Sequence, residues 1–216
     1  MNSVDAIYDG EGQLMMLATL TKANPMMGAL FLLGVASGLR IGDLLALKVG
    51  DLGSQMAVVE RKTGKTKRFE LDADHLEFLT TYADGRPPDA KLFPTTRTTV
   101  YRWFRRVADE LGLEGEIGTH TMRKTYLWNI FVLSGGDIEQ VRLAANHRWH
   151  STTIGYLRGG ISRLLARYAH DNQKNIIVPS GWSQKTSLTN TGQSDTIMGQ
   201  AKRGSAGEQP RPDLSM

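Results

Sequence analysis

Residues 25–36 restrict the fold of this chain more than any other segment. They read PMMGALFLLGVA and contain no charged side chain. Asn24 before Pro25 predicts a helix start, because Asn caps free backbone N–H groups and Pro fits the first helical turn. A helix that is apolar on nearly all sides is buried by several neighbours. The run is too short to span a bilayer, which takes roughly 20 residues, so it predicts a core helix and no membrane segment.

The remaining patterns predict more helices and one hairpin. Residues 56–61 and 66–71 have strand composition, and Thr63-Gly64 between them supplies the turn of a β-hairpin. Amphipathic spacing and capping residues predict further helices at 40–47, 74–82, 98–111, 119–134 and 137–145. The predicted fold class is mainly α with a small antiparallel β-sheet (α+β).

Length and composition predict one folded domain with a tail. A chain of 216 residues can build one sizeable core. Residues 1–23 are expected to be an N-terminal lead-in, and 24–170 the domain. Residues 171–216 are rich in Ser, Thr, Gln and Gly, so we expect a disordered tail. The absence of cysteine excludes disulfides and thiolate zinc sites.

Basic residues crowd two segments of the chain. Lys and Arg number 26 against 22 Asp and Glu, a net charge of +4. One crowded segment is 61–68 and the other is 102–106. Such patches contact phosphates, although composition alone is equally consistent with two solvated faces.

A spaced series of polar residues suggests chemistry on a phosphodiester. Arginine donates two parallel hydrogen bonds to phosphate and keeps its charge. His120 and Arg123 are three residues apart, so they can meet one phosphate from one helix face. His147 precedes Tyr156 by nine residues. A tyrosine hydroxyl that attacks phosphorus must lose its proton and needs nearby cations or a base.

Three stretches, GLRIGDLLAL, HTMRKTY and ANHRWHSTTIGYLR, resemble the motifs of the tyrosine recombinase (phage integrase) family. The resemblance implies that 24–170 is a catalytic domain of that fold. It implies these catalytic residues: Arg40, Lys62, His120, Arg123, His147 and Tyr156.

Within that set, Tyr156 is the expected nucleophile, with Tyr168 as its competitor, whereas Tyr101 and Tyr126 are expected in the core. Lys62 at the hairpin tip is the expected general acid, with Lys65 as the alternative. Asp43, one turn after Arg40, is expected either to hold its guanidinium or to be a helix surface charge, and the sequence favours neither.

The sequence departs from the family pattern at two positions. Asn146 stands where the family has glycine, and Lys124 stands where many members have a second histidine.

The same resemblance implies the activity and the partners. We expect a site-specific DNA recombinase of a mobile element that works through a 3′-phosphotyrosyl intermediate, without a cofactor or metal. Its partner would be double-stranded DNA. The protein would be a monomer in solution and a homotetramer on DNA. The expected DNA contacts are Arg61, Lys65, Lys67, Arg102, Arg105, Arg106 and Lys124.

An accessory DNA-binding protein, or the core-binding domain that usually precedes this domain in the family, would assist. The expected location is the cytoplasm of a bacterium or a phage-infected host, at the nucleoid. Two alternatives stay open: a DNA-binding regulator with the same fold, and a type IB topoisomerase.

Overall fold

Helix α2 (Pro25–Ser37) forms the centre of the core. The computed structural model describes residues 4–167, with side chains up to Ile161. Asn24 caps α2 by accepting hydrogen bonds from the N–H groups of Met26 and Met27, as predicted. Every residue from Met27 to Ser37 is buried. Burying a side chain such as Leu30 or Phe31 stabilises the fold by roughly 1.5–3 kcal/mol.

Helices α1 (Gly10–Ala23) and α4 (Ala73–Ala83) pack against α2, and α5 (Arg97–Glu110) packs against α1 and meets α2 where the Phe104 ring lies 5.7 Å from the Phe31 ring. Residues 1–23, expected to be a lead-in, contain α1, which buries Met16 and Leu20 completely. The alternation of Leu, Met and Thr in α1 gives a weak amphipathic pattern, which explains why the sequence did not reveal it. The residues expected to be a lead-in therefore contribute to the core.

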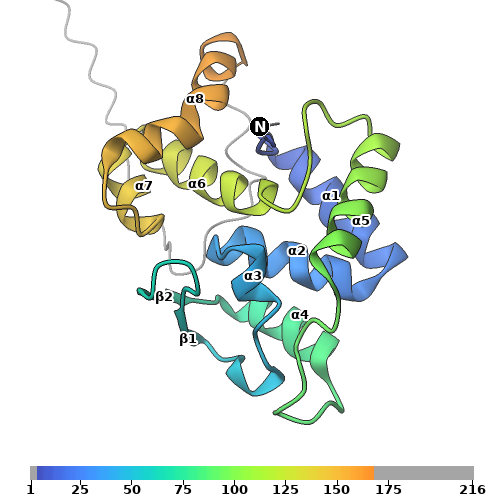
Figure 1. The fold of residues 1–216 in the computed structure, drawn as a ribbon. Helices are drawn as coiled ribbons and strands as arrows, with labels where there is room; N and C mark the ends of the chain where they lie inside the picture. The colour runs from blue at the N-terminus through green and yellow to red at the C-terminus, as the bar shows by residue number, and fades with distance from the viewer. Residues whose placement is uncertain (1–3, 168–216) are drawn as a thin grey trace, which may run out of the picture. The chain divides into compact units, whose positions relative to one another are not determined.

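Helix α6 (Thr121–Leu133) joins this core to a second one. Gly34 of α2 allows the close approach, since a Cβ there would lie 2.3 Å from the Met122 sulfur. The other side of α6 packs against α7 (Ile138–Ala144) and α8 (His150–Arg167), burying Leu127, Val141 and Leu157. Figure 1 shows α6, α7 and α8 grouped together above the hairpin.

The hairpin consists of β1 (Gln55–Val59) and β2 (Thr66–Glu70), with Val59 paired to Thr66. It follows two short elements, α3 (Ile41–Leu44) and the 3₁₀ turn η1 (Val49–Asp51). In the described part of the chain this pair of strands is the whole sheet. The predicted fold class, mainly α with a small antiparallel sheet, is confirmed (Figure 1). The predicted tail and Tyr168 lie outside the described residues.

Candidate active site

A cleft of about 630 Å³ collects the predicted residues. Five of the six side chains predicted to be catalytic line it: Arg40, Lys62, His120, His147 and Tyr156. They come from the start of α3, the hairpin tip, the start of α6, the α7–α8 connection and α8. Arg61 lines the cleft as well, and so does Arg97, which the sequence analysis did not single out.

Arg40 owes its position to the turn that ends α2. Gly38 has a φ of +63°, and a Cβ there would also lie 2.2 Å from the Tyr126 ring. Both features require glycine. Arg40 then occupies the position before α3, at the junction of the two helices, and its side chain is 20% exposed.

The carboxylate that holds Arg40 is Glu60, and both expected roles of Asp43 are wrong. Arg40 Nη1 donates to Glu60 Oε1 over 2.5 Å. Asp43 Oδ1 instead accepts from the Arg61 backbone N–H over 2.9 Å, which fastens the hairpin to α3. A signal for Glu60 was present in the sequence: side chains alternate along a strand, so residue 60 continues the inward face of Met56 and Val58.

Arg123 is buried beside Arg40 and does not line the cleft. Its Nη1 donates to Gly38 O over 2.7 Å and lies 3.4 Å from Glu60 Oε1, and its Nη2 donates to Ala145 O over 2.6 Å. Burial lowers the pKa of this guanidinium, the charge of Arg40 lowers it further, and Glu60 opposes both. The Nε of Arg123 has no hydrogen-bond partner among the described residues.

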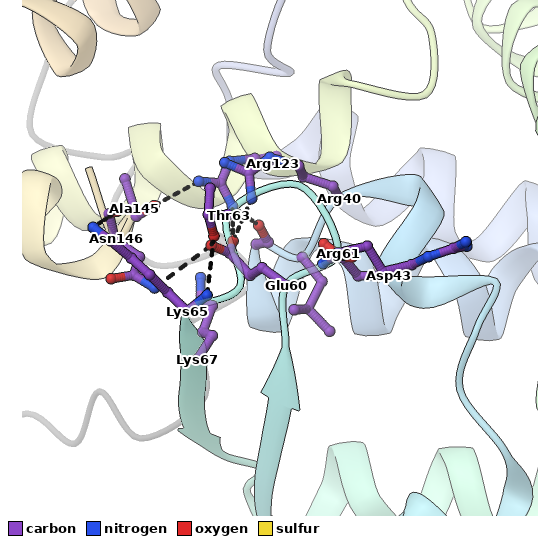
Figure 2. A network of polar contacts seen from close by, with 12 residues as sticks. Arg40, Asp43, Glu60, Arg61, Thr63, Lys65, Lys67, Arg123, Ala145 and Asn146 are labelled. Carbon is purple, nitrogen blue, oxygen red and sulfur yellow. Dashed lines mark hydrogen bonds and ion pairs between the residues drawn. The ribbon is translucent and has the colours of Figure 1, made fainter. Parts of the chain in front are cut away.

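Three cations bind consecutive carbonyls at the end of α7. Lys67 Nζ donates to Ala144 O, Arg123 Nη2 to Ala145 O and Lys65 Nζ to Asn146 O. These carbonyls lie at the negative end of the helix, where positive charge is stabilising. Figure 2 shows this group from the side of the hairpin.

The burial of Lys67 contradicts its predicted DNA contact. Its side chain is 5% exposed, and its Nζ lies 4.3 Å from the centre of the Tyr126 ring. Burial lowers its pKa well below the ordinary value, and Arg123 adds to this effect. A lysine enclosed in this way cannot reach a DNA phosphate. The sequence placed it among exposed basic neighbours, but strand alternation turns it inward.

His147 is positioned by the way α7 ends. Asn146 has a φ of +56°, its N–H donates to Leu143 O, and the His147 N–H donates to Arg142 O. This Schellman-type ending favours glycine and tolerates asparagine, which explains how Asn146 can replace the glycine of the family pattern. The imidazole Nδ1 lies 3.1 Å from the hydroxyl of the buried Thr153.

Both histidines of the site favour the neutral form. Burial lowers the pKa of His147 to about 4, and the charges of Arg123 and Arg40 contribute. Burial also lowers the pKa of His120, followed by the charge of Arg97. His120 is the residue before α6, and Arg123 is the third residue of that helix. The two are therefore about one helical turn apart. A neutral imidazole keeps one ring nitrogen that can accept a proton, although the lowered pKa makes each of these two a weaker base than an unperturbed histidine.

Tyr156 is the one described tyrosine that lines the cleft. Its ring lies 5.2 Å from that of His147 and 5.9 Å from Lys124 Nζ. Tyr126 is in the core as predicted, and burial raises its pKa to about 12, which makes it a poor nucleophile. The prediction that Tyr101 is in the core is wrong, since it is 45% exposed.

The arginines of α5 are exposed to different degrees. Arg102 and Arg106 are exposed, and the Arg106 guanidinium lies 3.8 Å from the Trp103 ring centre. Arg105 is half-buried and pairs with Asp109 and Glu116 at 3.5 and 3.2 Å. Arg102 and Arg106 are therefore better placed for an external phosphate than Arg105.

No group of three or more His, Asp or Glu side chains that could hold a metal ion occurs within the described part of the chain. His150, the nearest histidine in sequence to His147, pairs with Glu139 over 2.7 Å. None of the helices described is both long enough and apolar enough to cross a membrane.

Sequence similarity to known proteins identifies the family of this chain. The sequence model of the phage integrase family matches residues 11–160. This chain is a member of the phage integrase family. A probable integrase/recombinase, YoeC of Bacillus subtilis, is 32% identical over 150 residues, which cover 65% of this chain and 81% of that protein. Tyrosine recombinase XerD of Ralstonia nicotianae is 28% identical over 156 residues, 64% of this chain and 50% of that protein.

Solved structures of integrases have the same fold. The lambda integrase catalytic core matches with a TM-score of 0.52 at 20% identity, over 67% of this chain and 96% of that one. XerH bound to its difH substrate before cleavage matches with a TM-score of 0.59 at 19% identity, over 76% of this chain and 55% of that one. The chain thus corresponds to nearly all of an isolated catalytic core and to about half of XerH and XerD.

Proposed function

We propose that this member of the phage integrase family is a site-specific DNA recombinase that cleaves and rejoins strands through a 3′-phosphotyrosyl intermediate. One observation carries the proposal: Tyr156 shares a single cleft with Arg40, Lys62 and two histidines. The only described tyrosine in the cleft is thus surrounded by the groups that phosphoryl transfer needs.

The side chains in and beside the cleft account for each bond made and broken and for each proton moved. The Tyr156 oxygen attacks the scissile phosphorus while the bond to the 5′ oxygen breaks, and a phosphotyrosine forms. The phenolic proton passes to a neutral imidazole, for which we propose His147, whose ring lies 5.2 Å from that of Tyr156. Arg40 stabilises the charge on the phosphate, and Arg123 adds positive potential behind it. Attack by the 5′ hydroxyl of a second strand then reverses the step and frees Tyr156.

Lys62 is the proposed general acid for the 5′ oxygen. It lies at the exposed hairpin tip and lines the cleft, whereas the Nζ of Lys65 donates to Asn146 O, 3.3 Å away. Lys62 has no such carbonyl partner within residues 4–167, so it is freer to carry a proton to a leaving group.

The proposed partner is double-stranded DNA, held by three exposed arginines and one half-buried lysine. Arg61 in the cleft, Arg102 and Arg106 on α5, and Lys124 beside Tyr156 are the proposed contacts. A lambda integrase tetramer bound to a Holliday junction has this fold at a TM-score of 0.56. A homotetramer on DNA is therefore the proposed working assembly, completed by an accessory protein or a core-binding domain.

A trapped covalent adduct tests the proposal. The protein is mixed with a library of nicked duplexes whose sequence is randomised around the nick, so that a short cleaved fragment diffuses away and the adduct cannot reseal. Denaturing gels then reveal DNA attached to protein, and sequencing identifies the site. We expect an adduct with the wild type and with Tyr101→Phe, a matched control on an exposed tyrosine. We expect none with Tyr156→Phe.

Each other result has a definite meaning. An adduct that persists in Tyr156→Phe moves the nucleophile to another tyrosine, such as Tyr168. Binding without any adduct favours the regulator. Adducts with relaxation of supercoils and no recombinant product favour the topoisomerase.

A further inference from the structure

Glu60 is a buried carboxylate in an exposed part of the chain. It directly follows β1 and is 0% exposed, whereas each residue from 61 to 66 is exposed. Burying a charged carboxylate is costly unless it is paired and hydrogen-bonded. The contacts that offset this cost therefore indicate what the residue does.

Both carboxylate oxygens contact groups of the proposed active site. Oε1 accepts from Arg40 Nη1 over 2.5 Å and lies 3.4 Å from Arg123 Nη1. Oε2 accepts from Thr63 Oγ1 over 2.9 Å and lies 3.5 Å from Asn146 Nδ2. Figure 2 shows the Glu60 carboxylate close to Arg40, Arg123 and Thr63.

The backbone of Glu60 also shapes the turn that carries Lys62. Its N–H donates to Lys65 O over 2.9 Å, and its carbonyl accepts from the N–H groups of Thr63 and Gly64. One residue thus connects the arginine pair, the lysine hairpin and the residue before His147.

The net charge of this cluster is positive, as binding of a phosphate requires. Two guanidinium groups and one carboxylate carry a net charge of +1. Without the carboxylate, the arginines would repel each other, and Arg40 would lose the bond that fixes its direction, whereas Arg123 would keep its bonds to Gly38 O and Ala145 O. With it, one positive charge remains for a phosphodiester anion, and the directions of the guanidiniums are set before DNA arrives.

We infer that Glu60 is a positioning residue that sets the arginine pair and the hairpin bearing Lys62 in register for phosphoryl transfer. This inference rests on the proposed function. It assigns Glu60 no contact with the reacting atoms.

The test separates the rate of cleavage from the affinity for DNA. Glu60→Gln keeps the shape of the side chain and removes its charge. At saturating DNA its single-turnover cleavage rate constant should fall on the order of 10²-fold, since misplacement by about 1 Å costs that much. Its affinity, measured in the Tyr156→Phe background, should change by less than about threefold. The matched control is Glu70→Gln on the same hairpin, an exposed residue, which should leave both quantities unchanged.

Two further measurements identify positioning as the cause. A 5′-bridging phosphorothiolate needs no proton on its leaving group, so it should recover part of the loss in Glu60→Gln. Thr63→Val removes the hydroxyl bond to Glu60 and the longer bond that the same hydroxyl accepts from the Lys65 N–H over 3.4 Å. Because Thr63 is exposed, this variant should slow cleavage about fivefold without unfolding the chain. Because this second variant keeps the buried carboxylate, it decides the matter if Glu60→Gln does not fold.

Wild-type rate constants in both variants overturn the inference. So does a rate that falls only in parallel with DNA affinity. If the wild type cleaves no DNA, the proposed function fails, but Glu60 can still be assessed by hydrogen exchange. The amides of Thr63, Gly64 and Lys65 should exchange at least about tenfold faster in Glu60→Gln than in Glu70→Gln. Equal exchange would show that Glu60 does not hold the hairpin.

Discussion

Arg40 and Arg123 share one buried carboxylate, whereas the arginines of α5 lie along a face that contacts water. The charge is the same, but the surroundings are opposite. Around Glu60 each guanidinium has a fixed direction and is shielded from salt. On α5, Arg106 lies against Trp103, and Arg102 is exposed.

This difference separates two uses of a positive charge. A fixed, partly dehydrated guanidinium stabilises charge that develops during a reaction. An exposed one attracts a polyanion, with a strength that salt controls. Variants of the two groups should therefore change different quantities.

The largest expected effect is on the rate of cleavage in variants of Arg40. Arg40→Ala should slow the reaction by about 10²–10³-fold, as loss of one preorganised donor does elsewhere. Arg40→Lys should restore little, because an ammonium cannot reproduce the planar fork that meets Glu60. Single-turnover assays on the trapped substrate measure both. A rate near that of the wild type for Arg40→Lys would contradict the fixed-guanidinium picture.

The second-largest effect is a pH dependence of the free energy of unfolding, caused by His147 beside the buried arginines. The pKa of His147 is about 4 in the folded chain, against 6.5 for an unperturbed histidine. Between pH 6.5 and pH 4 the unfolded chain therefore binds more protons than the folded chain. The free energy of unfolding that His147 contributes is fully present above pH 6.5 and is lost as the pH falls toward 4. The loss should amount to no more than about 3 kcal/mol.

Urea unfolding at a series of pH values checks this prediction. His147→Gln should remove most of the slope in that window. The control His75→Gln should remove less, because the pKa of His75 is lowered by burial but raised by Asp72. An unchanged slope in His147→Gln would mean that its imidazole is not held neutral.

The exposed arginines should affect binding and leave the rate at saturating DNA unchanged. Arg102→Gln combined with Arg106→Gln should lower DNA affinity on the order of tenfold. The slope of log affinity against log salt should fall by about 1 for each phosphate that is no longer neutralised. Arg105→Gln is the internal control and should change less, since Arg105 already pairs with Asp109 and Glu116. Equal slopes in all variants would place α5 away from DNA.

The smallest expected effect is on the free energy of unfolding, in variants of Asn146 at the end of α7, where three cations bind. Asn146 has a left-handed backbone, so Asn146→Ala should lose about 1–2 kcal/mol of unfolding free energy. Asn146→Gly should lose much less, because glycine adopts this conformation readily. Thermal or urea unfolding compares the two. Equal losses would mean that the bond from Asn146 to Glu60 outweighs the backbone preference.

Much of the fold could be predicted because its signals are local. The apolar run of α2, the capping residues and the Thr63-Gly64 turn depend on neighbours in sequence, and each was found where predicted. Helix α1 was missed because its apolar spacing is irregular. Tyr101 was misplaced because an aromatic residue on a helix does not reveal how far it is covered.

The sequence by itself determined the ordered series of polar residues, and the resemblance of their motifs to those of the family was sufficient to predict that Arg40, Lys62, His120, His147 and Tyr156 belong together. Only the tertiary structure decided which carboxylate serves the arginines, because Glu60 meets Arg40 and Arg123 through contacts between segments 20 and 63 residues apart. It also turned Lys67 inward, away from its exposed basic neighbours. Charge and spacing are properties of the chain, but burial and pairing depend on what folds against a residue.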